Sequence, residues 1–124
     1  MKKFIYILLI VDMLFAFNHI SDGEIVEHKY FTLSYCEKYE QPYWVSYKIT
    51  KRNFLYFTSR RNNFRTDKKV KTISATPDDY KYSGYDKGHL APANLFRFNL
   101  IAMKECFFMS NMSPQKAGFN RGVW

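Results

Sequence analysis

Residues 85–92 read Tyr-Asp-Lys-Gly-His-Leu-Ala-Pro and place His89 directly after a glycine, with the acid Asp86 and the base Lys87 just upstream. A single histidine is more often structural than catalytic, so this stretch alone does not identify a site. Neutral histidine has an ordinary pKa near 6.5 and can take a proton from water at neutral pH. A cation beside it can stabilise negative charge that develops on a phosphate. His89 is therefore a candidate general base, and Lys87 is its candidate electrostatic partner.

Amide side chains follow at two places downstream. Residues 110–115 read Ser-Asn-Met-Ser-Pro-Gln, and residues 119–124 read Phe-Asn-Arg-Gly-Val-Trp. Neutral amide oxygens near a turn suit a hard cation that keeps most of its waters. A neutral histidine, a neighbouring basic residue and such an ion are together sufficient for metal-assisted hydrolysis of a phosphodiester.

The elements expected around these segments are short and irregular, which indicates an α+β fold. Alternating side chains predict a strand over residues 42–50 and a shorter partner over residues 30–35. Asn99 is a candidate cap for a short helix through Lys104. Three further predictions are brief extended segments at residues 90–93 and 106–109, and a turn or helix start at residues 113–114.

The composition indicates one domain, or part of one, with an anionic partner. The chain has 124 residues, is 47% hydrophobic and carries a formal net charge of +8. Residues 48–71 hold nine Lys and Arg and a single acid, Asp67, so this segment alone carries +8. Such a run is either a solvated face or a phosphate-binding surface whose affinity falls with salt.

Cysteine and glycine usage excludes several classes of protein. Two cysteines do not make a disulfide scaffold or a zinc finger, and neither a Walker loop nor a dinucleotide fingerprint is present. Cys36 and Cys106 either pair, if the chain is exported, or are buried as small apolar residues.

The amino terminus has the features of a targeting segment. Lys2 and Lys3 precede an apolar run over residues 4–17 that Asp12 interrupts. The basic start and the length of the run predict a secretory signal over residues 1–22, with an amino-terminal anchor or a buried strand as alternatives. We therefore expect an exported chain, periplasmic or secreted, without stable membrane association after the signal is cleaved.

The three ordered motifs resemble those of the DNA/RNA non-specific endonuclease family, the ββα-metal nucleases that include mitochondrial endonuclease G and secreted bacterial nucleases. That family carries Asp-Arg-Gly-His, then Ser-Asn-x-x-Pro-Gln, then Asn-x-Gly/Asn-x-Trp. The counterparts here are residues 86–89, 110–115 and 120–124, in the same order. The resemblance implies an α+β fold of the ββα-metal type over residues 27–124. It also implies a metal-dependent endonuclease that hydrolyses DNA and RNA without sequence specificity, through contacts to the backbone.

The resemblance assigns the central roles residue by residue. It implies that His89 is the general base and that Asn120 directly ligates a divalent ion, Mg²⁺ or Mn²⁺. Lys87 occupies the place of the family's usual arginine. Lysine keeps the charge but lacks the bidentate fork, so its hold on a phosphate is expected to differ.

Other residues are expected to support the site. The resemblance places Asp86, Asn111 and Gln115 there as positioning residues, and a structural turn role is an equal alternative for the two amides. An upstream arginine is also implied; Arg61 is preferred, with Arg60 and Arg65 as alternatives. The residues expected to bind the nucleic-acid backbone are Arg60, Arg65, Lys68 and Lys69.

Two departures from the family pattern concern the wall of the site and the metal-carrying helix. Residues 94–96 read Asn-Leu-Phe where the family has an acid-containing stretch. Members of the family continue through a long helix beyond the position of Trp124, so we expect the helix that carries Asn120 to be incomplete. The alternatives to a nuclease are a catalytically inactive, basic nucleic-acid-binding fragment and a non-enzymatic exported protein. The oligomeric state is not predicted.

Overall fold

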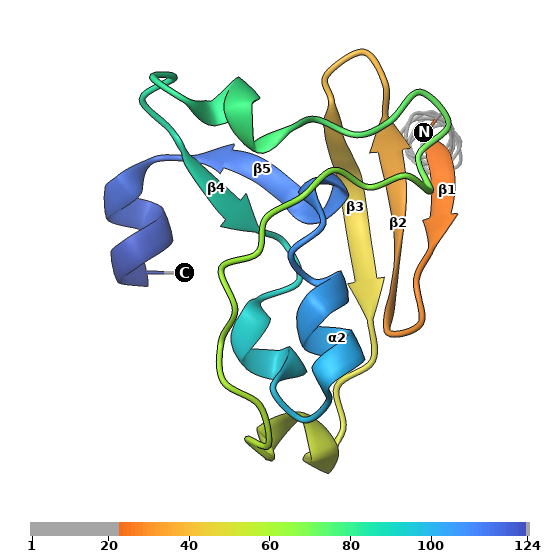
Figure 1. Cartoon of the computed structure of the whole chain (residues 1–124), viewed down its shortest axis with the longest axis vertical. Helices are drawn as coiled ribbons and strands as arrows, with labels where there is room; N and C mark the ends of the chain where they lie inside the picture. Colours follow the sequence, from red (N-terminus) through yellow and green to blue (C-terminus); the bar gives the residue numbers. More distant parts are fainter. Residues whose placement is uncertain (1–22, 124) are drawn as a thin grey trace, which may run out of the picture.

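A computed structural model describes residues 23–123 and shows a three-stranded sheet, a two-stranded sheet and short helices (Figure 1). The antiparallel sheet has the order β1-β2-β3 and consists of Glu24–Glu27, Phe31–Cys36 and Gln41–Tyr47. In the two-stranded sheet, β4, Asp86–His89, pairs antiparallel with β5, Met112–Gln115. The α-helix α2 spans Leu100–Glu105. The predicted α+β class is confirmed.

Single helical turns connect these elements. Four are 3-10 turns, and the fifth, η5, is a π-helical turn that follows β5 and lies beside β4 (Figure 1). In chain order they are η1 Lys51–Phe54, η2 Pro77–Tyr80, η3 Ala93–Phe96, η4 Met109–Asn111 and η5 Phe119–Val123.

Two predicted strands and the predicted helix are confirmed. Residues 30–35 and 42–50 correspond to β2 and β3, but β3 ends at Tyr47. Beyond it, the backbone N–H of Thr50 donates to Oδ1 of Asn53 at 2.7 Å, which begins η1. Asn99 caps α2 as expected, because its Oδ1 accepts hydrogen bonds from the N–H groups of the first turn at 2.8 and 3.2 Å.

Three local predictions are wrong. Residues 106–109 form a turn and the start of η4 rather than a strand, with a single parallel bridge from Phe108 to Arg65. Residues 90–93 do not extend, because η3 begins at Ala93. Residues 113–114 lie within β5, and Pro114 is tolerated there because β5 pairs with a single strand, β4, among the described residues.

The core fills the space between one face of the sheet and the segment that contains η3 and α2. Phe96 is its centre, since its ring makes edge contacts with Phe31 at 6.2 Å and with Tyr47 at 5.7 Å between centroids. Cys36 and Cys106 are both buried free thiols, in agreement with the alternative in which they are apolar core residues.

A buried carboxylate joins three parts of the chain. Oδ2 of Asp67 accepts hydrogen bonds from Nε2 of His28 at 2.8 Å and from Oγ of Ser110 at 2.6 Å. Oδ1 accepts from the backbone N–H of Lys69 at 3.0 Å. Burial alone would raise the pKa of Asp67, but the hydrogen bonds outweigh it and hold the pKa below its ordinary value. The acid in the basic segment is therefore a structural centre rather than a surface charge.

Replacement of Asp67 tests this role. Asp67→Ala leaves His28 and Ser110 buried without their acceptor, so the free energy of unfolding should fall by about 3–5 kcal/mol. The exposed ion pair of Asp78 with Lys81 provides the control, and Asp78→Ala should cost about 1 kcal/mol or less. Urea unfolding followed by circular dichroism measures both. Equal unfolding midpoints for the two variants would contradict the assignment.

Candidate functional site

The antiparallel pairing of β4 with β5 sets the position of His89. His89 pairs with Met112 at the end of β4, and Gly88 pairs with Ser113. A Cβ atom on Gly88 would lie 2.1 Å from Cδ of Gln115, so the glycine lets the Gln115 side chain lie across the strand. Gln115 thus packs against the backbone immediately before His89.

Asn111 fixes the backbone immediately after His89. Its side chain is fully buried and binds both backbone groups of Ala91, accepting from the N–H at 2.9 Å and donating to the carbonyl at 3.1 Å. The same amide nitrogen donates to the carbonyl of Cys106 at 2.9 Å. The backbone of Asn111 also accepts from the N–H of Leu90 at 3.0 Å. The Asn111 side chain and backbone therefore hold the chain segment that directly follows His89.

Two phenylalanines surround the His89 ring. The ring of Phe107 contacts it edge-on at 4.7 Å between centroids, and Phe64 lies at 5.6 Å. His89 is 6% exposed. Burial, with a smaller contribution from the positive charge of Arg60, lowers the pKa of His89 to about 4. His89 is therefore neutral at physiological pH and can accept a proton.

Two cations lie over the same aromatic rings. The guanidinium of Arg60 lies 5.4 Å from the centroid of Phe107, and Nζ of Lys87 lies 5.0 Å from the centroid of Phe64. Cation–π contacts of this kind hold a long side chain in place without neutralising its charge. The rings that bury His89 thus also keep Arg60 and Lys87 beside it.

An acid, an amide and an arginine meet where the start of β4 contacts η5. Oδ2 of Asp86 accepts from Nδ2 of Asn120 at 3.0 Å and from Nε of Arg121 at 2.8 Å, and Oδ1 accepts from Nη2 of Arg121 at 2.7 Å. The hydrogen bonds from Arg121 and then Asn120 lower the pKa of Asp86 to about 2. Because the amide nitrogen of Asn120 faces Asp86, its oxygen is directed away from the carboxylate.

One hollow of about 470 Å³ is lined by residues of the loop over 60–64, of β4 and the residue before it, and of η5; they are Arg60, Asn62, Phe64, Tyr85, Asp86, Lys87, His89, Asn120 and Arg121. A second, adjoining hollow shares four of the same residues and extends towards Asn94. Asn94 belongs to the stretch that departs from the family pattern, so the departure lies in the wall of the site, as expected. The residues shared by the two hollows are Arg60, His89, Asn120 and Arg121.

The upstream arginine that the structure brings to the site is Arg60, which was an alternative to the preferred Arg61. Arg61 is exposed and lines neither hollow. The loop that carries both residues has no regular periodicity, so the sequence pattern did not distinguish them. Arg121 and the two phenylalanines were not predicted. For Arg121 a signal existed, since it directly follows Asn120.

The remaining predicted nucleic-acid contacts lie outside the hollows. The guanidinium of Arg65 lies 4.0 Å from the ring centroid of Phe108, and burial lowers its pKa. Lys69 donates from Nζ to the backbone carbonyl of Glu27 at 2.6 Å. Lys68 is exposed. Their contact with nucleic acid remains a prediction.

The residues of the hollow fit a hydrated hard cation rather than a fully caged ion. Within residues 23–123, no group of three or more His, Cys, Asp and Glu is close enough to hold a metal. The amide oxygen of Asn120 is a suitable ligand for an ion that keeps water and phosphate oxygens in its other positions.

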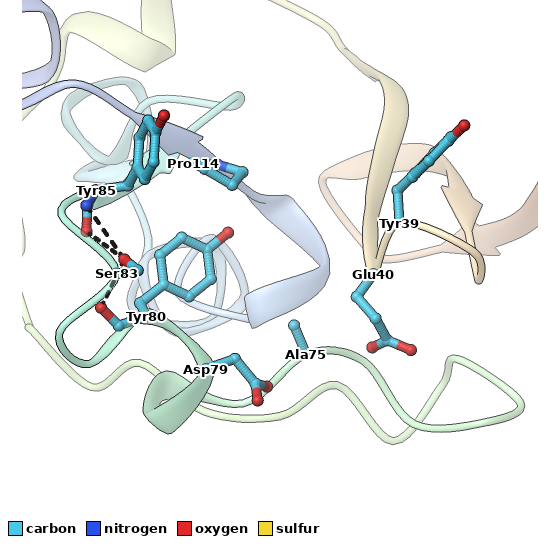
Figure 2. A pocket seen from close by; sticks show the side chains of 8 residues that line it. All are labelled: Tyr39, Glu40, Ala75, Asp79, Tyr80, Ser83, Tyr85 and Pro114. Atoms are coloured by element: carbon cyan, nitrogen blue, oxygen red, sulfur yellow. Dashed lines mark hydrogen bonds between the residues drawn. The ribbon is translucent and has the colours of Figure 1, made fainter.

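A smaller and more apolar pocket adjoins the hollow at Tyr85, which lines both. Figure 2 shows Tyr80 and Tyr85 on one side of this pocket and Tyr39 and Glu40 on the other, with Pro114 between them. Burial, with a contribution from Asp79, raises the pKa of Tyr80 to about 12. The residues that line this pocket include no histidine, lysine or arginine. We therefore place the candidate site in the hollow with His89.

Comparisons with known proteins agree with the motifs. The model of the DNA/RNA non-specific endonuclease family matches residues 15–124. The human mitochondrial nuclease EXOG is 37% identical over 94 residues, which are 74% of this chain and 26% of that protein. The mitochondrial nuclease of Saccharomyces cerevisiae is 38% identical over 98 residues, 76% of this chain and 30% of that protein.

A solved structure supports the same assignment. A chain of the crystal structure of the EndoG/EndoGI complex superposes with a TM-score of 0.74 at 31% identity, covering 82% of this chain and 44% of that chain. The predicted ββα-metal fold is therefore confirmed. The chain spans less than half the length of each of these relatives.

The prediction that the chain is exported is wrong. The human and yeast relatives are mitochondrial nucleases, and this finding contradicts a periplasmic or secreted location. The predicted signal over residues 1–22 lies outside the described residues. Between residues 23 and 123, no helix has the length and apolar character needed to cross a membrane.

The pKa of His89 generates a prediction about stability. Between pH 4 and 6.5 the unfolded chain protonates this histidine while the folded chain does not, so folding should weaken as the pH falls. The loss in free energy of unfolding that comes from His89 should approach about 3 kcal/mol at pH 4 and should be absent above pH 6.5. Urea unfolding at several pH values measures it, with His89→Gln as the control. If the free energy of unfolding fell equally steeply between pH 6.5 and pH 4 in His89→Gln and in the parent chain, the lowered pKa would be refuted.

Proposed function

Because the chain belongs to the DNA/RNA non-specific endonuclease family, we propose that its hollow hydrolyses phosphodiester bonds of DNA and RNA with the help of a divalent ion. The observation that carries the proposal is that a neutral, buried His89 faces the same hollow as Arg60 and Asn120. A base, a cation and a neutral oxygen ligand are the three groups that water attack on a phosphodiester needs.

His89 acts as the general base. Its lowered pKa keeps it unprotonated at neutral pH, and the phenylalanines around it limit rotation of the ring. It accepts a proton from the water molecule that attacks phosphorus, while the bond from phosphorus to the leaving oxygen breaks. Asn111 and Gln115 support this step by fixing the backbone on either side of His89.

Arg60 and Lys87 stabilise the phosphate. Both lie next to His89 through the rings of Phe107 and Phe64, and neither forms an ion pair among the described residues. Negative charge that builds up on the phosphate oxygens therefore meets two cations already in position. Contacts of this kind do not read base edges, which supports hydrolysis without sequence specificity.

Asn120 would hold the divalent ion through Oδ1, oriented by the hydrogen bond from its amide nitrogen to Asp86. Mg²⁺ fits best, because it keeps several waters and binds through few protein ligands, and Mn²⁺ fits the same oxygen set. When bound, the ion supplies positive charge to the phosphate oxygens.

Nicking of supercoiled plasmid by the chain tests the base and the ion together. Chelation should abolish cutting, and His89→Ala should slow it by about 10²–10⁴-fold. Added imidazole should restore part of the rate in His89→Ala, because it replaces the missing base and not the missing packing. Undiminished cutting after chelation or in His89→Ala would refute the proposal. A chain that binds DNA but cuts none under any of these conditions would instead be the inactive binding fragment.

The neighbouring arginines provide a matched pair for the cation. Arg60→Ala should slow cutting by about 10²-fold, the usual effect of removing one group that stabilises developing charge. Arg61→Ala removes the same charge one residue away, outside both hollows, and should change the rate by no more than about threefold through long-range attraction. Initial rates of nicking measure both. Equal effects would show that the segment acts only by its net charge.

A further inference from the structure

Asp86 is the one acidic side chain among the described residues that line the hollow. A carboxylate attracts a hard divalent cation more strongly than a neutral amide does, because it adds a full negative charge to the same kind of oxygen ligand. The hollow therefore contains a stronger potential ligand than Asn120, immediately beside it. Asp86 and Asn120 both line the hollow, but the oxygens of Asp86 already accept hydrogen bonds from Arg121.

Both oxygens of Asp86 accept hydrogen bonds from two consecutive residues of η5, Asn120 and Arg121. Arg121 binds the carboxylate with two nitrogens, at 2.8 Å to Oδ2 and 2.7 Å to Oδ1, and Asn120 donates to Oδ2 at 3.0 Å. A bidentate guanidinium contact fixes the plane of the carboxylate as well as its charge. The Asp86 side chain is 20% exposed and that of Arg121 is 72% exposed, so the carboxylate is mostly covered while the guanidinium stays largely in contact with solvent.

We propose that Arg121 keeps Asp86 out of the metal's coordination shell and makes it an anchor for the Asn120 amide, so that the ion is held by one neutral protein ligand. This inference rests on the proposed function, because it concerns the same ion. It assigns Arg121 as a positioning residue that acts through Asp86 and determines how tightly the hollow holds a divalent ion. An ion held by one neutral oxygen keeps its remaining positions for water and phosphate oxygens.

Mn²⁺ binding without nucleic acid tests the inference by a readout that does not depend on cutting. Water-proton relaxation or electron paramagnetic resonance measures free and bound Mn²⁺. In Arg121→Ala the released carboxylate should become a ligand, and Mn²⁺ should bind about tenfold more tightly than to the parent chain. In an Asp86→Asn background, Arg121→Ala should tighten Mn²⁺ binding by at most about threefold, which is the contribution of a removed positive charge in water.

Two further variants complete the design. Arg121→Lys keeps the charge but lacks the fork, so Mn²⁺ affinity should rise part of the way to that of Arg121→Ala. Arg61→Ala removes an arginine outside the hollows and should leave Mn²⁺ affinity within twofold of the parent. Arg121 lies on the surface, so circular dichroism should show all of these variants folded like the parent.

Two results would overturn the inference. Unchanged or weaker Mn²⁺ binding in Arg121→Ala would show that Asp86 is not released to the ion. Tightening of the same size with and without Asp86 would show that Arg121 acts only as a nearby charge. The proposed function is tested separately by plasmid nicking, so a nuclease that cuts normally but fails these binding tests refutes this inference alone.

Discussion

The buried carboxylate of Asp67 connects the sheet, the basic segment and the site. Its Oδ2 accepts from His28, which follows β1, and from Ser110, which lies in η4. Ser110 is followed directly by Asn111, whose amide binds the backbone of Ala91 two residues beyond His89. A continuous path of hydrogen bonds and short stretches of backbone therefore runs from the edge of the sheet to the candidate base. Because a buried charge without partners is strongly destabilising, this path fixes which segments can be neighbours.

The environment of His89 serves two physical requirements at once. The base must be unprotonated at neutral pH, and the phosphate must meet positive charge. Phe107 and Phe64 bury the ring, which disfavours its charged form, and they also contact the cations Arg60 and Lys87 through their faces. Arg60 further lowers the pKa of His89 by its charge. In the proposed mechanism, the cation that would attract the substrate also helps to keep His89 unprotonated.

The sequence was sufficient where a local rule determines the structure. Side-chain alternation predicted β2 and β3, and the Asn99 side chain predicted the start of α2. The ordered motifs singled out Asp86, Lys87 and Asn120, which line the same hollow as His89. It was insufficient where the outcome depends on residues distant in the chain. Residues 106–109 are apolar enough for a buried strand, yet they form a turn whose backbone is hydrogen-bonded to Arg65, far upstream in the chain: Arg65 N–H donates to the carbonyl of Phe107, and Met109 N–H donates to the carbonyl of Arg65. Asp67 looked like one acid in a basic run, and only its contacts with residues 39 and 43 positions away make it structural.

The balance of charge in the hollow determines which ligand it favours. Arg60, Lys87 and Arg121 contribute positive charge, and Asp86 contributes negative charge that Arg121 already neutralises through two hydrogen bonds. His89 and Asn120 are neutral, so the unneutralised charge of the lining comes from Arg60 and Lys87. Such a surface attracts a polyanion and repels an isolated cation. The proposed divalent ion would therefore be held most strongly when phosphate oxygens enter with it, because they supply the negative charge that the protein's own ligands lack.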